Sequence, residues 1–297
     1  MLPASRHLRR FFILALALLV ASCANAPYTH RRQLLLTSEG SETQMGYQAF
    51  RQIKQKYKVS HDRAINAEVQ KVGKRIAAAA RRPDYHWEFV VFDNKEANAF
   101  CLPGGKVGIF TGILKYTKNE AGLATVISHE VAHALARHAG ERMSQGMLAN
   151  IGGLGLGAAL GGMGAGAQQA IMTGYSLGAQ LGILLPYSRT QEYEADHIGL
   201  ILMAKAGYDP AQALAFWKRM MTNDKKVKMP QFLSTHPTDA NRLRELEAFL
   251  PQAEKYYVPH HKAKTRPRPK RPSPHHTVPA HPVPLPPVAG RWAPAPQ

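Results

Sequence analysis

Hydrophobic residues at helical spacing predict two helices in the first third of the chain. The clearer pattern covers residues 62–81, and Pro83 follows as a helix stop. Its apolar face is formed by Ile65, Val69, Val72 and Ile76. A mixed polar and apolar stretch over residues 41–57 predicts a helix just before it.

The hydrophobic period then shortens to two residues, which is typical of strands. Apolar and polar positions alternate over residues 86–91, and two further short strands are predicted at 97–102 and 106–110. Pro103-Gly104-Gly105 between the last two is a sequence typical of a tight turn. We therefore expect a small antiparallel β-sheet in this part of the chain.

Helical patterns return after the strands. Residues 120–137 are rich in helix formers and follow Asn119, a suitable helix cap. Further helices are predicted over 190–206, 210–220 and 238–250, and Pro251 is expected to end the last one. The pattern as a whole predicts an α+β fold, mainly α, with the small sheet beside helix 120–137.

The N-terminus has the layout of a secretory signal, with three arginines before an apolar run that ends near Val20. This run is too short to cross a bilayer, so we expect residues 1–22 to be removed. Val20-Ala21-Ser22-Cys23 resembles a bacterial lipobox, which implies acylation of Cys23 and a stable anchor in a lipid bilayer. Ala24 then favours the outer membrane of a Gram-negative envelope; an ordinary cleavage site is the alternative.

Composition divides the remainder into an anchor linker at 23–40, a domain at 41–251 and a tail at 252–297. From Pro259 onward the chain has twelve prolines, five histidines and no acidic residue, so we expect a disordered basic tail. The formal charge is +18, of which about +8 lies outside the signal and the tail. An exported chain meets no nucleic acid, so an anionic envelope polymer is the expected counter-charge. With two cysteines, disulfides do not hold this fold together.

The string His129-Glu130-Val131-Ala132-His133 lies within the predicted helix 120–137. Residues four apart project from one helix face, so both imidazoles can bind a single ion. This is the HEXXH pattern, in which zinc lowers the pKa of its water to about 7 and a neighbouring carboxylate takes the proton. Glu130 is the candidate general base. Two partly buried histidines on an amphipathic helix are the alternative.

A third metal ligand is expected on helix 190–206, which contains Glu192-Tyr193-Glu194-Ala195-Asp196. Glu192 and Asp196 share a helix face, so one can bind zinc while the other supports a ligand. Glu194 is a rival for the third position. It lies roughly 200° around the helix from Glu192, so both cannot face the metal.

HEXXH followed by Glu-x-x-Ala-Asp, with Ser188-Arg189 just before it, resembles gluzincin metallopeptidases of the HtpX and CAAX-prenyl-peptidase type, which include periplasmic lipoproteins. The likeness extends from about Asn98 to Arg242. It implies a gluzincin-like metallopeptidase domain with one Zn²⁺ bound by His129, His133 and Glu192. Asp196 would then orient His129 from behind.

Two further segments match this family. Residues 98–105 resemble its strand beside the cleft, so Asn98 and Ala99 are candidate substrate-binding residues for an extended peptide. Ser234-Thr235-His236-Pro237 resembles a segment whose histidine approaches the active site. His236 would either stabilise the oxyanion or occupy the open position of zinc in a resting form, while Arg242 braces the site.

Two other residues are not assigned to the chemistry. Cys101 is expected to behave as a small buried hydrophobe rather than as a nucleophile. His138 lies nine residues after His129, half a rotation around a continuous helix, so it is expected to face away from the metal.

Residues 143–188 contain no charged residue and twelve of the 24 glycines. A spacing of four between Gly153, Gly157 and Gly161 would suit helix packing in a membrane. So much glycine weakens helices, and three glutamines interrupt the run, so a mobile lid or a helical hairpin over the cleft is favoured.

We expect a zinc endopeptidase that hydrolyses unfolded or misassembled envelope proteins. A chaperone or assembly factor for outer-membrane proteins, with peptidase activity secondary, is a different reading of the same residues. A non-catalytic zinc-stabilised lipoprotein is a third, which the presence of Glu130 disfavours.

Overall fold

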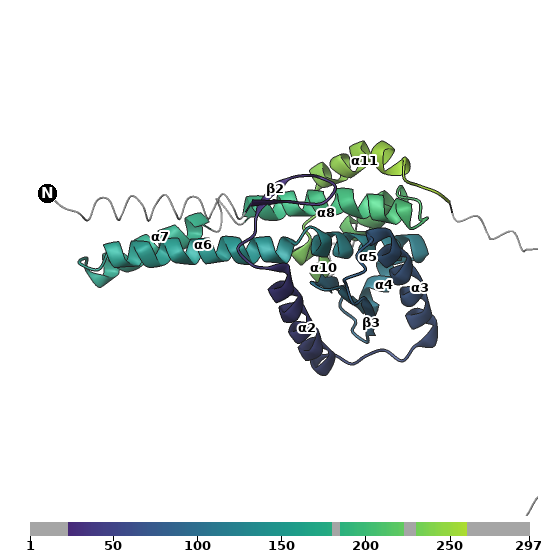
Figure 1. Ribbon diagram of the computed structural model, residues 1–297, viewed down its shortest axis with the longest axis horizontal. Helices are drawn as coiled ribbons and strands as arrows, with labels where there is room; N and C mark the ends of the chain where they lie inside the picture. Colours follow the sequence, from purple (N-terminus) through teal and green to yellow (C-terminus); the bar gives the residue numbers. More distant parts are fainter. Residues whose placement is uncertain (1–22, 180–184, 223–229, 260–297) are drawn as a thin grey trace, which may run out of the picture. The chain divides into compact units, whose positions relative to one another are not determined.

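The computed structural model describes residues 23–179, 185–222 and 230–259 (Figure 1). The predicted signal and all but the start of the predicted tail lie outside these residues. The described part is mostly helical, with one three-stranded sheet and one short N-terminal hairpin. This agrees with the α+β class predicted from the sequence.

The three-stranded sheet contains β3 (Glu88–Phe92), β4 (Ala99–Leu102) and β5 (Lys106–Phe110) in the order β3-β5-β4. Strands β4 and β5 form the predicted antiparallel hairpin, and the glycines of its turn have positive φ. Strand β3 pairs with β5 in parallel, so the sheet is mixed rather than antiparallel throughout. Strand β5 is buried along most of its length, which suits the central position.

Helices α2 (Glu39–Lys56) and α3 (Arg63–Ala80) begin at side-chain caps. Ser38 accepts a hydrogen bond from the backbone of Ser41, and Asp62 accepts from the first turn of α3. The apolar stripe of α3 packs against α5 and β3, with Val69, Val72 and Ile76 at most 1% exposed. The two predicted helices are therefore confirmed to within two residues.

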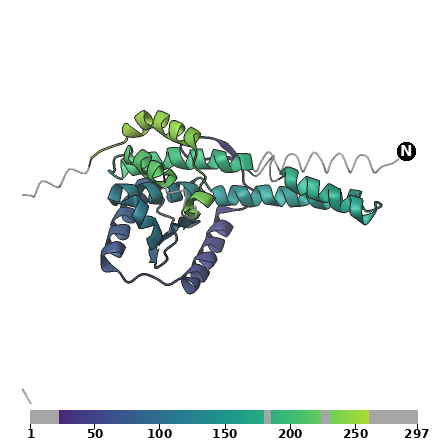
Figure 2. The same ribbon diagram turned by 180° about the vertical axis from the view of Figure 1, so that it is seen from behind.

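Helix α5 (Glu120–Leu135) lies at the centre of the domain and carries the HEXXH sequence. Every residue from Gly122 to Leu135 is buried, because α3, α8, α9 and β4 surround the helix. Helix α8 (Leu185–Lys205) lies beside it in both views (Figures 1 and 2). A Cβ on Gly199 would lie 3.2 Å from the backbone nitrogen of His129, so glycine permits this close approach.

Short elements complete the domain. A 3₁₀ turn (Thr111–Ile113) and α4 (Leu114–Thr117) lead into α5, while α9 (Gln212–Met221) and α10 (Gln231–Thr235) follow α8. Helix α11 (Ala240–Glu254) continues through Pro251, where the sequence predicted its end. Ala253 is fully buried, and this packing favours another helical turn. The tail therefore starts later than residue 252.

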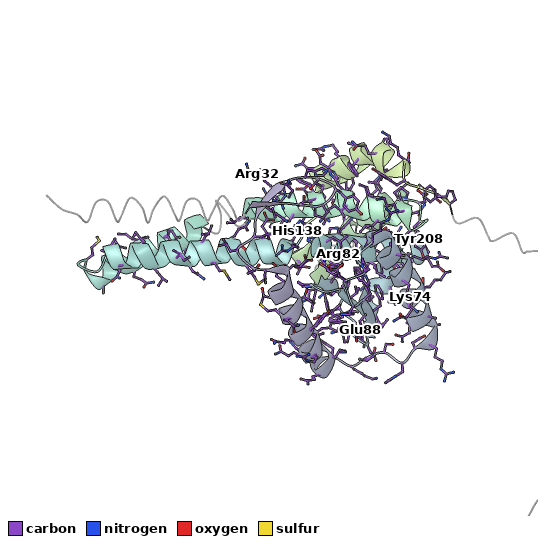
Figure 3. All side chains as sticks on the ribbon, in the orientation of Figure 1. Arg32, Lys74, Arg82, Glu88, His138 and Tyr208 are labelled. Carbon is purple, nitrogen blue, oxygen red and sulfur yellow. The ribbon has the colours of Figure 1, made fainter. Side chains whose placement is uncertain are left out.

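The glycine-rich segment forms a helical hairpin of α6 (His138–Ala159) and α7 (Ala165–Ala179). The two helices approach closely at Gly152 and Gly153, which lie against Tyr175, and the Tyr175 hydroxyl donates to the carbonyl of Ala149 at 2.7 Å. Side chains project along this hairpin (Figure 3), and the exposed large apolar ones include Met147, Ile151, Leu154, Met163 and Ile171. Among the described residues, no helix is both long and apolar enough to span a membrane. A lid role remains a prediction.

The segment predicted as an anchor linker is folded. Strands β1 (Cys23–Asn25) and β2 (Arg32–Leu34) form an antiparallel hairpin, and β2 packs against α6. Ala26, Gln33 and Leu35 are at most 9% exposed. Residues 23–36 thus belong to the folded domain, because Ala26 and Leu35 are buried and β2 packs against α6.

Candidate active site

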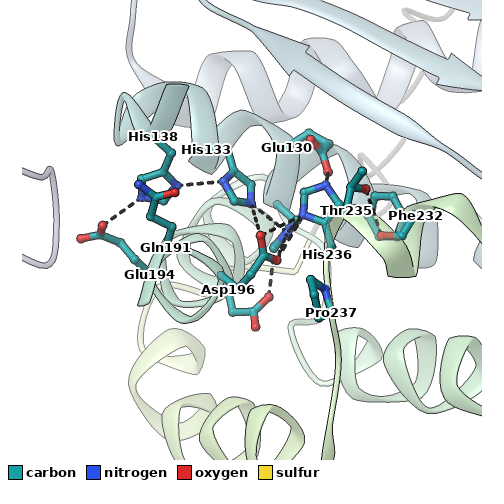
Figure 4. A network of polar contacts seen from close by, with 12 residues as sticks. Glu130, His133, His138, Gln191, Glu194, Asp196, Phe232, Thr235, His236 and Pro237 are labelled. Atoms are coloured by element: carbon teal, nitrogen blue, oxygen red, sulfur yellow. Dashed lines mark hydrogen bonds and ion pairs between the residues drawn. The ribbon is translucent and has the colours of Figure 1, made fainter. Parts of the chain in front are cut away.

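Helix α5, helix α8 and the residue that follows α10 bring four potential ligands to one point; Figure 4 labels two of them, His133 and His236. His129 and His133 come from α5, Glu192 from α8, and His236 directly follows α10. One ligand atom from each residue lies within 4.8 Å of the others, and all four side chains are buried. The structure therefore brings together the three predicted ligands and His236, the further histidine that was expected to approach the site.

The spacing of these atoms fits a zinc ion. Tetrahedral zinc with ligand distances of about 2.0–2.1 Å holds neighbouring ligand atoms about 3.3 Å apart. Nε2 of His129 lies 3.1 Å from Nε2 of His133 and 3.2 Å from Nδ1 of His236. Oxygen atoms of Glu192 lie 3.3 Å and 3.4 Å from these Nε2 atoms. Imidazole and carboxylate donors at this spacing suit one bound cation.

Protonation of the ligands follows from their burial and charge. Burial holds the pKa of His133 well below its usual value, which keeps the imidazole neutral. Burial opposes ionisation of Glu192, but His133 and hydrogen bonds from the histidines hold its pKa well below the usual range. Burial also opposes a charged His129, yet Asp196 and Glu192 raise its pKa to about 9. A zinc ion that binds His129 would therefore compete with a proton for the imidazole.

Asp196 and Arg242 support His129 from behind. Oδ1 of Asp196 lies 3.0 Å from Nδ1 of His129, which leaves Nε2 facing the metal position. Arg242 donates from Nε and Nη2 to both oxygens of Asp196, at 2.6 Å and 2.9 Å. Its Nη1 lies 3.0 Å from Oε2 of Glu192, and its guanidinium stacks on Trp217. Both residues lie where the resemblance placed them.

His138 does not face away from the site, as the sequence predicted. Arg137 adopts a left-handed conformation with φ of 53°, so α5 ends at Leu135 and α6 begins at His138 without the regular helical rotation between them. The ring of His138 therefore turns back, and its Nδ1 lies 2.8 Å from Nδ1 of His133 (Figure 4). The prediction failed because it assumed one continuous helix.

Glu194, the rival third ligand, points away from the four-residue cluster. Its Oε2 lies 2.9 Å from Nε2 of His138, and its other oxygen accepts from the hydroxyl of Thr29. Burial alone would raise the pKa of Glu194, but hydrogen bonds from His138, Arg31 and Thr29 lower it to about 2. The carboxylate is therefore ionised, and its hydrogen bonds hold it away from the metal position.

Glu130, the predicted general base, is buried beside His236. Its Oε1 lies 3.3 Å from Nε2 of His236, and no hydrogen bond reaches this oxygen among the described residues. Burial raises the pKa of the carboxyl, although the charge of His236 acts against the shift. A base with a raised pKa is better matched to proton transfer near neutral pH.

Strand β4 lies at the edge of the sheet and contacts α5. The amide of Phe110 donates to the carbonyl of Asn98 at 3.0 Å, so in the antiparallel pattern Ala99 and Cys101 direct their backbone groups to the outer edge. Burial raises the pKa of the Cys101 thiol well above its usual range, and Glu130 adds to this. The thiol is therefore protonated and close to the carboxylate of Glu130.

The backbone just before β4 already forms a hydrogen bond with another part of the chain. The amide of Phe232 on α10 donates to the carbonyl of Ala97 at 2.9 Å. The same short helix leads directly into His236. A backbone hydrogen bond thus joins the segment just before β4 to the short helix that precedes His236.

Sequence reasoning missed Arg31 and Glu141. Arg31 donates to both oxygens of Glu141, at 2.8 Å and 2.7 Å, and to Glu194 at 2.8 Å. Neither residue belongs to a recognised motif. The available signal was the position of Glu141 one helical turn after His138, in a helix whose only other Asp, Glu, Lys or Arg is the neighbouring Arg142.

The fold and the site define a zinc metallopeptidase: an HEXXH helix, a glutamate from a second helix, and a buried carboxylate beside the metal position. The chain belongs to peptidase family M48, whose family model matches residues 63–250. Members of this family use zinc, and the four-residue cluster can hold one ion per chain.

Known relatives are metalloendopeptidases. The chain is 36% identical over 235 residues to the mitochondrial metalloendopeptidase OMA1 of Schizosaccharomyces pombe, covering 77% of this chain and 66% of that protein. It is 30% identical over 214 residues to the beta-barrel assembly-enhancing protease of Escherichia coli, covering 70% of this chain and 43% of that protein. The chain thus matches less than half of this bacterial relative. Family and site together make it a zinc metalloendopeptidase.

Proposed function

We propose that this chain hydrolyses peptide bonds in unfolded or misassembled proteins of the bacterial cell envelope. The observation that carries the proposal is the position of Glu130, which lies beside a buried His129–His133–Glu192 metal site and near an edge strand. The similarity to a bacterial beta-barrel assembly-enhancing protease supports the envelope setting. The substrate class follows from the need for an extended, unpaired segment of chain.

In the proposed reaction, His129, His133 and Glu192 hold zinc, which when bound activates a water and polarises the scissile carbonyl. Glu130 accepts the proton of the attacking water and returns it to the leaving amine. Asp196 holds the proton of His129 at Nδ1, so that Nε2 keeps its lone pair for the metal. Arg242 fixes Asp196 and balances the charge of Glu192.

His236 acts in this proposal as a resting ligand. A catalytic zinc site keeps one position open for water or substrate, whereas four protein ligands close it. Nδ1 of His236 lies 3.2 Å from Nε2 of His129 and 3.1 Å from both oxygens of Glu192, as expected for the fourth ligand. His236 must therefore move aside before hydrolysis. The alternative role, stabilisation of the oxyanion, requires it to leave this position as well.

An extended substrate segment binds by adding a strand to β4. Ala99 and Cys101 direct backbone groups to the outer edge, and such pairing gives affinity without requiring a particular sequence. Asn98 already occupies one group of this edge, because its side-chain oxygen accepts from the amide of Ala99 at 3.0 Å, so a substrate would pair with that amide only after the Asn98 side chain turns away. This mode of binding suits unfolded chains, since folded proteins rarely offer a free strand.

The proposed location is the periplasmic face of the outer membrane. The lipobox-like sequence before Cys23 and the Ala24 that follows it support a lipid anchor of the kind found in periplasmic lipoproteins. The basic tail would bind an anionic envelope polymer. Labelling with a radioactive or clickable fatty acid, with Cys23→Ala as the control, tests the anchor.

A second candidate function is assembly or chaperone activity with proteolysis secondary. The relative named as a beta-barrel assembly-enhancing protease favours it. Glu130→Gln separates the two, because it keeps the shape and the ligands but removes the base. Full rescue of an envelope defect by this variant would support the assembly function, and no rescue would support proteolysis.

The direct test of proteolysis is cleavage of an unfolded outer-membrane protein by the purified zinc-loaded chain. We expect internal cleavage that Glu130→Gln abolishes, whereas the folded form of the same substrate is resistant. Equal cleavage of folded and unfolded forms would contradict the proposed substrate class.

A further inference from the structure

A line of polar contacts connects the zinc ligand His133 with the N-terminal hairpin. Nδ1 of His133 lies 2.8 Å from Nδ1 of His138, and Nε2 of His138 lies 2.9 Å from Oε2 of Glu194. Arg31, between β1 and β2, donates from Nε to the same oxygen at 2.8 Å. Figure 4 shows His138 between His133 and Glu194. The contacts thus run from residue 31 to the metal site.

The residue at the end of this line of contacts determines which nitrogen carries the proton in each hydrogen bond. Glu194 can only accept, so Nε2 of His138 carries a proton and Nδ1 of the same ring is the acceptor. Nδ1 of His133 must then be the donor, which leaves Nε2 of His133 unprotonated and facing the metal position. Each contact therefore favours the tautomer of His133 that zinc requires.

Arg31 supplies the positive charge that this arrangement needs. The side chains of Glu141 and Glu194 are only 1% and 3% exposed, and Arg31 pairs with both at 2.7 Å. Two ionised carboxylates buried side by side repel each other unless a cation lies between them. Without Arg31, the carboxylate of Glu194 would turn toward solvent, and His138 would lose its fixed acceptor.

We propose that Arg31 is a positioning residue for the zinc ligand His133, acting through Glu194 and His138, so that the N-terminal hairpin is part of the metal site. The family model begins at residue 63, so the hairpin adds to the site from outside the matched region. The proposal rests on zinc binding at His133. It is independent of the substrate and the location proposed above.

The test compares Arg31→Ala with Arg32→Ala in the full chain. Arg32 is the exposed neighbour on β2 (Figure 3) and makes no side-chain contact to this network among the described residues. Zinc affinity is measured by competition with a chromogenic chelator, and the geometry of the site by the absorption spectrum of the Co²⁺-substituted protein. Loss of an outer partner of a ligand typically weakens metal binding about 10–100-fold.

We expect Arg31→Ala to weaken zinc binding by about tenfold, at the low end of this range because it acts through two intermediates, and to change the Co²⁺ spectrum. Arg32→Ala should match the parent in both. An unaltered zinc affinity and spectrum in Arg31→Ala, with an equal loss of melting temperature in the metal-free and metal-loaded forms, would reduce Arg31 to a structural role and overturn the proposal.

Glu194→Gln, which keeps the volume of the side chain, tests the route. If Arg31 acts through Glu194, adding Arg31→Ala to Glu194→Gln should weaken zinc binding further by much less than it does in the parent. Additive effects would exclude this route. Should Arg31→Ala fail to fold, Arg31→Lys keeps the charge but not the paired hydrogen bonds, and the same measurements apply to it. All of these readouts remain valid even if no proteolysis is found.

Discussion

The two nitrogens of His236 face the two acidic residues of the active site: Nε2 lies 3.3 Å from Oε1 of Glu130, and Nδ1 lies 3.1 Å from both oxygens of Glu192. One imidazole therefore occupies the position of the fourth ligand and also contacts the proposed base. We expect His236→Ala to open this position. Hydrolysis of a short unstructured peptide should then accelerate, measured as kcat/KM at saturating zinc.

Slower hydrolysis by His236→Ala would instead identify His236 as an oxyanion stabiliser. Loss of one such hydrogen-bond donor lowers kcat by about 10²–10³. Thr235→Ala is a suitable control, because its hydroxyl contacts only backbone carbonyls within α10 among the described residues.

Glu130→Gln should lose hydrolysis and keep zinc. The amide preserves the shape of the side chain but cannot accept the proton of the attacking water, and general-base catalysis contributes about 10²–10⁴ in rate. Zinc content by atomic absorption and peptide cleavage on the same preparation measure both effects. Cleavage at the parental rate would show that another group is the base.

His133→Ala should lose both zinc and hydrolysis. Removing one of three protein ligands leaves Glu192 and His129 buried beside an incomplete site. We expect substoichiometric zinc after gel filtration, with far-ultraviolet circular dichroism close to that of the parent. Full zinc retention would mean that His133 is not a ligand.

Removing zinc from the parent protein should lower its melting temperature. A ligand that binds only the folded state at 1,000 times its Kd stabilises that state by about 4 kcal/mol. Calorimetry before and after chelation, followed by addition of zinc, measures the effect. A melting temperature that does not respond to either step would contradict binding to the folded site.

Arg242→Met should destabilise the fold even without zinc. The Arg242 side chain is 2% exposed, and it pairs with Asp196 inside the domain. Breaking a buried pair by removing one partner typically costs about 3–5 kcal/mol, because the other charge remains buried. Urea unfolding measures the loss, and Arg244→Ala, at an exposed position on the same helix, should differ little from the parent.

Local patterns in the sequence sufficed to predict the main helices and the pair of histidines on α5, whereas Glu192 and His236 were predicted from the family resemblance. The spacing of His129 and His133 places both on one helix face, and a stretch of buried apolar residues fixes that face toward the interior. The match to a second motif was needed to choose Glu192 over Glu194, since both lie on α8.

Long-range features were not predictable in the same way. The parallel pairing of β3 with β5 depends on which strand enters the centre of the sheet, and alternation alone does not encode that. The position of His138 depends on one backbone conformation at Arg137, a non-glycine residue with positive φ. The contacts of Arg31 cross more than one hundred residues of sequence, and a single basic side chain gives no sign of such a partner.

The hydrogen bond from the amide of Phe232 to the carbonyl of Ala97 has a mechanical consequence. A peptide that extends its pairing along the edge of β4 as far as Ala97 must displace this amide. Displacement would remove one backbone contact of the short helix that leads to His236, so occupancy of the edge would favour release of the imidazole. Binding of the polypeptide to be cut would thereby help to activate the enzyme. With an empty edge, His236 would stay at the position of the fourth ligand, and the enzyme would be inactive.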